Sequence, residues 1–165
     1  MGIDRGIEVY HGSFTEVDYP EIRTHRFTKD FSWGFYCTEI QKQAEKWASR
    51  FVTPTVSVYR LRDLDNLDVK HFNDYCDEWL DFVVHCRNGG VHDYDVVMGP
   101  MADDTIYDYL DAYKQNKMNR EEFFKLMKFK YPTHQISFHS IKALSNLEFV
   151  GSYEVKFNAK TKTLR

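Results

Sequence analysis

The pattern of hydrophobic and polar positions predicts short strands interleaved with amphipathic helices. Short apolar or alternating segments predict strands at residues 7–11, 33–38, 55–61, 95–98, 134–139 and 147–157. Apolar residues spaced three and four apart predict helices at residues 41–51, 73–86, 103–113 and 119–129, with a helical turn at 141–144. Pairing of the last strand with the strand at 134–139 is one arrangement that this order allows. Because this order lacks a βαβ rhythm, we expect an α+β fold.

Composition narrows the class of protein. The chain has 165 residues, 42% of them hydrophobic, and shows no repeat or linker, so a single domain over 1–165 is expected. A formal charge of −3 gives no bulk attraction to nucleic acid or to a membrane. The three cysteines form no CxxC pair, and no apolar run reaches the length of about 18 residues that a spanning helix needs. We expect a cytoplasmic protein with no bound metal and no membrane partner.

The first candidate for chemistry is the segment Tyr10-His11-Gly12-Ser13, where a predicted strand ends. It offers an imidazole, a main chain without Cβ and a hydroxyl. A primary carboxamide needs one hydrogen-bond donor and one acceptor side by side, which a bare backbone supplies. A plain strand followed by a Gly-Ser turn explains the same residues.

A second candidate is aromatic. Gly34 lies among large rings in the predicted strand at 33–38, which suggests a surface on which a planar group rests. Trp47 follows Tyr36 by 11 residues, on the predicted helix. Two rings about 7 Å apart sandwich a flat ligand by stacking. Packing of both rings in the hydrophobic core is the alternative.

The third candidate is the late strand at 134–139. Alternation places Gln135, Ser137 and His139 on one face. Gln135 is either a fixed donor and acceptor in a pocket or an edge residue that faces solvent. A shift of register by one residue would put His134 in its place.

Together these segments resemble a known family. The motifs V-Y-H-G-S, K-D-F-x-x-G-F-Y-x-T, Q-A-x-x-W-A and G-P-x-A-D-D follow one another within residues 8–147. Their order resembles the ADP-ribosyltransferase fold, nearest the branch of diphtheria toxin and the poly(ADP-ribose) polymerases, which carries a His–Tyr–Glu triad. The chain is most similar to uncharacterised bacterial ADP-ribosyltransferase-like proteins associated with toxin–antitoxin genes. The resemblance implies a split core of mixed and antiparallel β-sheet with flanking helices.

The resemblance also implies that NAD is the substrate and that no metal is used. His11 would bond a ribose hydroxyl, the Gly12 backbone would hold the nicotinamide carboxamide, and Ser13 would reach the adenosine-side ribose. Tyr36 would stack on one face of the nicotinamide and Trp47 on the other. Gln43 stands where the polymerases often carry a serine that bonds the carboxamide.

Gln135 departs from the family pattern, because it stands where the family has its catalytic glutamate. A neutral amide orients a ribose hydroxyl but stabilises an oxocarbenium ion less and accepts no proton. Asp103 and Asp104 are candidate replacement carboxylates, and helix capping or a place in the first helical turn explains them equally well.

These residues predict a mono-ADP-ribosyltransferase that acts as a toxin or defence effector on a macromolecule, either protein or nucleic acid. A small antitoxin protein is a possible partner. NAD glycohydrolysis by the same pocket is one alternative. A non-catalytic module that binds NAD or a partner is another. A nucleic-acid-binding protein unrelated to NAD is disfavoured by the net acidity.

Overall fold

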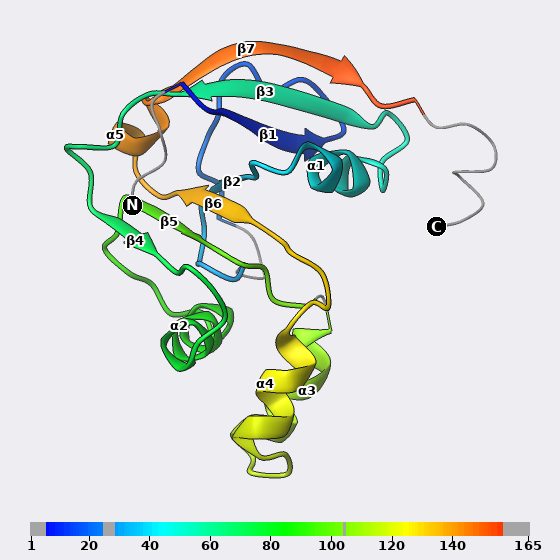
Figure 1. Ribbon diagram of the computed structural model, residues 1–165, viewed down its shortest axis with the longest axis vertical. Helices are drawn as coiled ribbons and strands as arrows, with labels where there is room; N and C mark the ends of the chain where they lie inside the picture. Colours follow the sequence, from blue (N-terminus) through cyan, green and yellow to red (C-terminus); the bar gives the residue numbers. More distant parts are fainter. Residues whose placement is uncertain (1–5, 25–28, 104, 157–165) are drawn as a thin grey trace. The chain divides into compact units, whose positions relative to one another are not determined.

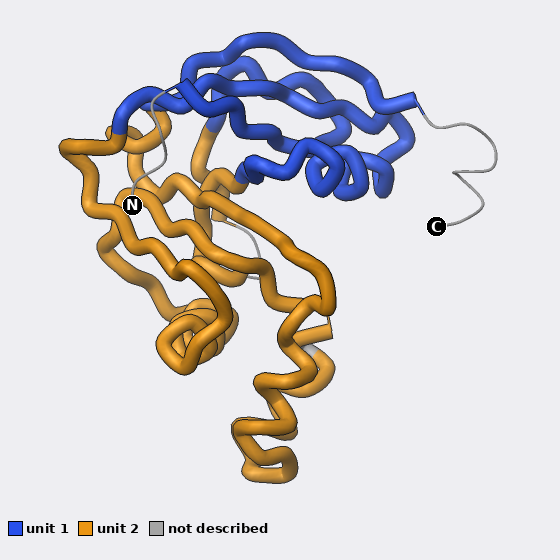
Figure 2. The backbone as a smooth tube through the Cα atoms, viewed as in Figure 1, with its two compact units in different colours: residues 1–20, 37–63, 146–165 blue, residues 21–36, 64–145 orange. Residues whose placement is uncertain are grey.

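A computed structural model describes residues 6–24, 29–103 and 105–156. The chain divides into two compact units built from interleaved segments (Figure 2). Unit 1 comprises Met1–Pro20, Cys37–Asp63 and Asn146–Arg165. Unit 2 comprises Glu21–Tyr36 and Leu64–Ser145. Each unit has its own sheet.

Unit 1 is built on an antiparallel three-stranded sheet (Figure 1). β3 (Thr55–Leu61) is the central strand, with β1 (Glu8–Ser13) on one side and β7 (Leu147–Glu154) on the other. Pairing of the last strand with the strand at 134–139 is therefore wrong. The physical reason lies in unit 2, where that strand already has a neighbour along each of its edges.

The single helix of unit 1 among the described residues, α1 (Gln41–Ala48), packs on this sheet through small residues. Ala44 and Ala48 are buried against Val56 of β3 and against Val155. Alanine is a good helix former and lets a helix backbone come close to a strand. The predicted helix at 41–51 is thus confirmed with an earlier end.

Unit 2 contains a mixed four-stranded sheet. Its order is β2 (Phe35–Cys37), β6 (Gln135–Phe138), β5 (Val96–Gly99) and β4 (Val69–His71). β4 and β5 run parallel, whereas β5 and β6 run antiparallel. All residues of the two inner strands are buried, as expected for strands covered on both faces. β4 was not predicted, because its three residues, Val-Lys-His, contain a single apolar position.

The helices of unit 2 supply most of its core. They are α2 (Asp77–Arg87), α3 (Ile106–Lys114), α4 (Arg120–Met127) and the short α5 (Ile141–Leu144). The buried side chains of the core are Phe31, Phe72, Trp79, Leu80, Val83, Val97, Ala102, Ile106, Leu110, Phe123 and Met127. α3 and α4 lie side by side in Figure 1, and the rings of Tyr113 and Phe123 stack between them with centroids 4.4 Å apart.

The fold is α+β, as predicted: one antiparallel sheet, one mixed sheet and helices. The more specific ADP-ribosyltransferase arrangement and the single domain stay predictions. None of the described helices is long and apolar enough to cross a membrane. Within the described ranges, no group of three or more His, Cys, Asp or Glu side chains is placed to hold a metal ion.

Candidate functional site

In unit 1 the candidate residues gather at the open edge of β1. Tyr10 exchanges two backbone hydrogen bonds with Thr38 on the side away from β3, at N···O distances of 2.8 and 2.9 Å. In an antiparallel pair, alternate residues direct their N–H and C=O groups to opposite sides of the strand. Gly12, two residues after Tyr10, therefore directs both groups to the same outer edge. Among the described residues, no hydrogen bond outside the strand ladders involves Gly12.

Gly12 is held in place by α1. A Cβ atom at this position would lie 2.3 Å from the carbonyl oxygen of Ala44 and 2.9 Å from the amide nitrogen of Ala48. These are backbone atoms of a packed helix and have little room to move. Glycine is therefore required for the helix to approach the strand this closely. The alternative of a simple strand-to-turn transition does not explain this requirement.

Gln43 and Trp47 lie one residue before the two alanines, so they form the adjacent stripe of α1. Both side chains are half-buried, so Trp47 is not sealed in the core. The Arg50 guanidinium carbon lies 3.9 Å from the centroid of the Trp47 ring. One face of the indole thus carries a planar cation, held by a cation–π interaction.

His11 and Ser13 occupy the opposite face of β1 from Gly12 because side chains alternate along a strand. Both are half-buried. His11 lies opposite Ser57 in the register of β1 with β3. The Ser57 hydroxyl accepts a hydrogen bond from the backbone amide of Val17, at 2.9 Å. His11, Gly12 and Ser13 thus form the end of β1. The main-chain groups of Gly12 point to the outer edge of the strand, whereas the side chains of His11 and Ser13 lie on one of its faces.

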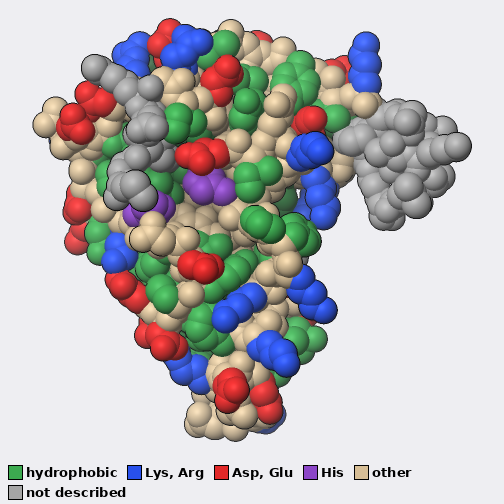
Figure 3. Space-filling view, viewed as in Figure 1, with side chains coloured by type: hydrophobic (Ala, Val, Ile, Leu, Met, Phe, Trp, Pro, Cys, Tyr) green, Lys and Arg blue, Asp and Glu red, His purple; other side chains and the backbone are tan. Residues whose placement is uncertain are grey.

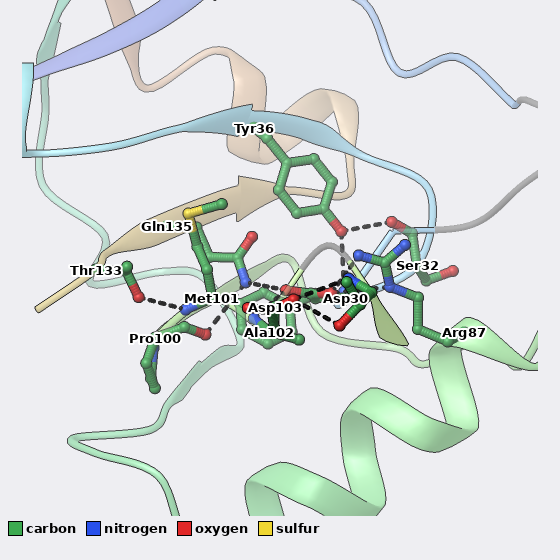
Figure 4. Close-up of polar contacts among 12 residues, drawn as sticks. Asp30, Ser32, Tyr36, Arg87, Pro100, Met101, Ala102, Asp103, Thr133 and Gln135 are labelled. Atoms are coloured by element: carbon green, nitrogen blue, oxygen red, sulfur yellow. Dashed lines mark hydrogen bonds and ion pairs between the residues drawn. The ribbon is translucent and has the colours of Figure 1, made fainter. Parts of the chain in front are cut away.

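Tyr36 belongs to unit 2, where its hydroxyl organises the preceding loop. The hydroxyl donates to the Ser32 carbonyl at 2.6 Å and accepts from the Phe31 amide at 3.0 Å (Figure 4). Ser32 adopts a φ of 76°, an unusual conformation for a residue with a side chain. Burial, followed by the nearby charge of Asp30, raises the pKa of Tyr36 well above its ordinary value. The phenol therefore stays protonated as a donor.

Two histidines fix the carbonyls on either side of Ser32. His92 Nε2 donates to the Phe31 carbonyl, and His139 Nδ1 donates to the Trp33 carbonyl, each at 2.8 Å. Since a carbonyl only accepts, these bonds assign the protonated nitrogen of each ring. Burial lowers the pKa of His139 to about 4 and lowers that of His92 as well. Both rings are neutral at physiological pH.

The structure confirms the predicted alternation in the late strand. The Ser137 hydroxyl and His139 Nε2 lie 2.7 Å apart, so these two side chains share a face. The planar group that rests on Gly34 is this imidazole, because a Cβ there would lie 2.8 Å from two atoms of the His139 ring. The His139 ring also meets the Tyr36 ring edge-on, with centroids 6.3 Å apart.

Gln135 does not face solvent, so the edge-residue alternative is wrong: its exposed fraction is 6%. Its amide nitrogen donates to Asp30 Oδ2 at 2.8 Å and to the Pro100 carbonyl at 3.2 Å. Asp30 is itself buried and pairs with Arg87, whose Nε lies 2.8 Å from Oδ1. The Ala102 amide donates to Asp30 Oδ2 at 2.8 Å. Figure 4 shows these contacts.

Sequence reasoning missed Asp30 and Arg87 as site residues. Asp30 stands in the K-D-F motif, but nothing near it in the sequence indicates its partner, because Arg87 is 57 residues away. The available signal was an aspartate beside the aromatic residues of this motif, since a charged group among core residues is rarely buried without a partner.

Of the two candidate replacement carboxylates, Asp103 and Asp104, only Asp103 lies within the described residues. Asp103 does not cap the helix directly, because α3 begins at Ile106 with Thr105 at its N-cap. Asp103 Oδ1 instead accepts from the amide and the hydroxyl of Thr105, at 2.9 and 2.7 Å. This small turn occupies one of its oxygens. Asp104 lies outside the described residues.

Charge on the face shown in Figure 3 does not favour one class of acceptor. On the face shown in Figure 3, Lys and Arg side chains lie among Asp and Glu side chains. Mixed charge of this kind produces no strong single-sign field to steer a nucleic acid.

Comparison with known protein families identifies the family to which the chain belongs. A family described as "Protein of unknown function (DUF3990)" matches residues 7–149, and the chain belongs to this family. The match includes the edge of β1, the aromatic motif, α1 and β6. No curated protein and no solved structure matches the chain.

Proposed function

We propose that this member of the DUF3990 family is an NAD-dependent mono-ADP-ribosyltransferase. The observation that carries the proposal is the outer edge of β1 at Gly12. There, an N–H donor and a C=O acceptor stand side by side on a residue without a side chain, next to a helix that requires this glycine. A nicotinamide carboxamide carries the complementary acceptor and donor, so it fits such an edge like one further backbone pair.

The remaining residues of unit 1 support the same ligand. Trp47 offers a half-buried indole on the adjacent stripe of α1, suited to stacking on a pyridine ring. Gln43, one turn earlier, offers an amide for the same carboxamide. His11 and Ser13 supply hydrogen-bonding side chains for ribose hydroxyls.

From unit 2 the proposal takes Tyr36 and Gln135. The Tyr36 hydroxyl is engaged with the loop, so in this proposal the ring is the part that contacts the nicotinamide. Gln135 would orient a ribose hydroxyl in place of the family glutamate. Because an amide accepts no proton, we propose transfer of a single ADP-ribose rather than chain elongation. The toxin or defence role, a cytoplasmic site of action and an antitoxin partner are further parts of this proposal.

Labelled NAD tests the function. The purified chain is incubated with NAD labelled in the adenine moiety, in a lysate and in buffer alone, and protein, nucleic acid and free ADP-ribose are separated. Label on a macromolecule supports transfer, and free ADP-ribose alone supports glycohydrolysis. Label that stays in NAD while NAD still binds supports the non-catalytic module. NAD that neither binds nor reacts refutes all three.

Three variants test the residue assignments: His11→Ala, Tyr36→Ala and Trp47→Ala. Each is expected to lower NAD cleavage by at least about tenfold, since each removes a contact with the reacting half of NAD. Tyr19→Ala is the matched control, because Tyr19 is an aromatic residue with an exposed fraction of 84%. Full activity in the three variants, with folded protein, would refute these residue assignments.

A further inference from the structure

Asp30 is a buried carboxylate to which the proposed chemistry gives no role. Only 3% of the residue is exposed. Its Oδ1 accepts from Arg87, at 2.8 Å from Nε and 2.5 Å from Nη2. Its Oδ2 accepts from the Ala102 amide and from the Gln135 side chain, each at 2.8 Å. A buried ion pair of this kind is weak evidence for stability, because removing both charges from water offsets much of their attraction.

The arrangement that Asp30 imposes concerns the side-chain amide of Gln135. The two ends of an amide have nearly the same shape, so packing alone does not decide which end points where. Here, however, the inner end faces Asp30 Oδ2 and the Pro100 carbonyl oxygen, and both are acceptors. Only the NH2 end of Gln135 satisfies them. The carbonyl oxygen must therefore point away from Asp30.

The outward direction of that oxygen is the side on which Tyr36 lies. In Figure 4 the carbonyl of Gln135 is turned toward the Tyr36 ring, while its nitrogen points to Asp30. Among the described residues, no hydrogen bond to this oxygen is seen. Gln135 is thus presented as an acceptor whose donor end is fully used.

We propose that Asp30 is a positioning residue: it fixes the amide of Gln135 so that the carbonyl oxygen is offered to a hydroxyl of the ligand. The ligand part rests on the proposed function, in which that hydroxyl belongs to a ribose of NAD. Arg87 balances the buried charge and binds Oδ1, which leaves Oδ2 to accept from the two other donors. The glutamine is then matched to the aspartate behind it, and neither residue does its work without the other.

Two double variants separate positioning from stability. Asp30→Asn with Arg87→Met removes the ion pair but keeps a carbonyl oxygen that accepts from Ala102 and Gln135. Asp30→Leu with Arg87→Met removes the ion pair and the acceptor together, with a side chain of similar size. Both lose the same charges, so the difference between them reports the acceptor. Changing Asp30 alone is avoided, because it leaves Arg87 buried without a partner.

The first measurement is nuclear magnetic resonance of the Gln135 side-chain amide, and it requires no ligand. In the wild-type chain and in the asparagine variant, we expect slow hydrogen exchange of this NH2 group and an Overhauser contact to the Ala102 amide proton, because both groups donate to the same oxygen. In the leucine variant the contact is expected to be lost. A retained contact there would overturn the proposal.

The second measurement is the release of nicotinamide from NAD. The leucine variant is expected to have a kcat about tenfold below that of the asparagine variant, with KM for NAD changed less than about threefold, as for an interaction that matters in the transition state. Equal kcat in the two variants would overturn the positioning role. If the wild-type chain cleaves no NAD, the proposed function fails instead, and the resonances of Gln135 still decide whether Asp30 sets its orientation.

Discussion

Replacing Gln135 by glutamate tests the site most sharply, because it installs the carboxylate that the resembled enzymes use. Shape is unchanged, so packing is preserved. The hydrogen-bonding role changes, because the NH2 donor that faces Asp30 is replaced by an oxygen of a second carboxyl group. We therefore expect Gln135→Glu to destabilise unit 2 and not to restore activity of a polymerase type.

The magnitude follows from the geometry. The Gln135 nitrogen lies 2.8 Å from Asp30 Oδ2. Two full charges about 3 Å apart repel by roughly 5 kcal/mol at an effective dielectric constant of about 20. The protein relieves this by binding a proton, which raises the pKa of the introduced glutamate above its ordinary value of about 4.3. Holding that proton costs about 1.4 kcal/mol per pH unit, which amounts to about 4 kcal/mol at pH 7.

The sign of the pH dependence is fixed by this raised pKa. The folded variant binds more protons than the unfolded chain, so its stability relative to wild type falls as the pH rises above about 4.3. Urea denaturation at pH 5 and pH 7 measures this difference. Gln43→Glu is the matched control: it makes the same change at a half-buried position of α1, and no comparable pH dependence is expected. A Gln135→Glu variant as stable as wild type at both pH values would refute the account of Asp30.

Three further predictions concern stability. Gly12→Ala is expected to lower the free energy of unfolding by about 1–3 kcal/mol, because its Cβ meets the α1 backbone. Gly151→Ala is the control, because a Cβ there meets nothing within 4 Å, and thermal unfolding compares the two variants. Tyr36→Phe is expected to cost about 1–3 kcal/mol through the two lost hydrogen bonds of its hydroxyl, yet to keep NAD binding because the ring remains; calorimetry and a binding titration check both. Burial lowers the pKa of His139 to about 4, against an ordinary value of 6.5, so protonation of this ring favours the unfolded chain. About 3 kcal/mol of the free energy of unfolding is therefore present above pH 6.5 and lost as the pH falls toward 4. His139→Asn should flatten the pH profile of urea denaturation in that window.

Local features of this chain were predictable from its sequence. The alternation that places Ser137 and His139 on one face is confirmed by their hydrogen bond. The predicted helix at 119–129 begins with Asn119 as its N-cap, since the side chain accepts from the Glu122 amide at 2.8 Å. Such features depend on residues close in sequence, where strand and helix periods and capping chemistry suffice.

Features set by distant partners were not predictable. The pairing of β7 with β3 depends on β6 having no free edge, which the sequence of β7 does not reveal. In the candidate site, Gln135 was identified but its orientation was not, because the orientation follows from Asp30 and Arg87, far away along the chain. Likewise, the need for glycine at position 12 comes from the backbone of α1.

The recognition of a primary carboxamide by the edge of β1 is the central claim, and the backbone amide of Gly12 reports on it directly. Nicotinamide and NAD are titrated against the 15N-labelled chain, with nicotinic acid as the matched control, because its carboxylate has no donor for the Gly12 carbonyl. We expect a saturable shift of the Gly12 resonance with nicotinamide and NAD, and a much weaker response to nicotinic acid. An unmoved Gly12 resonance at millimolar nicotinamide, or an equal response to nicotinic acid, would contradict it.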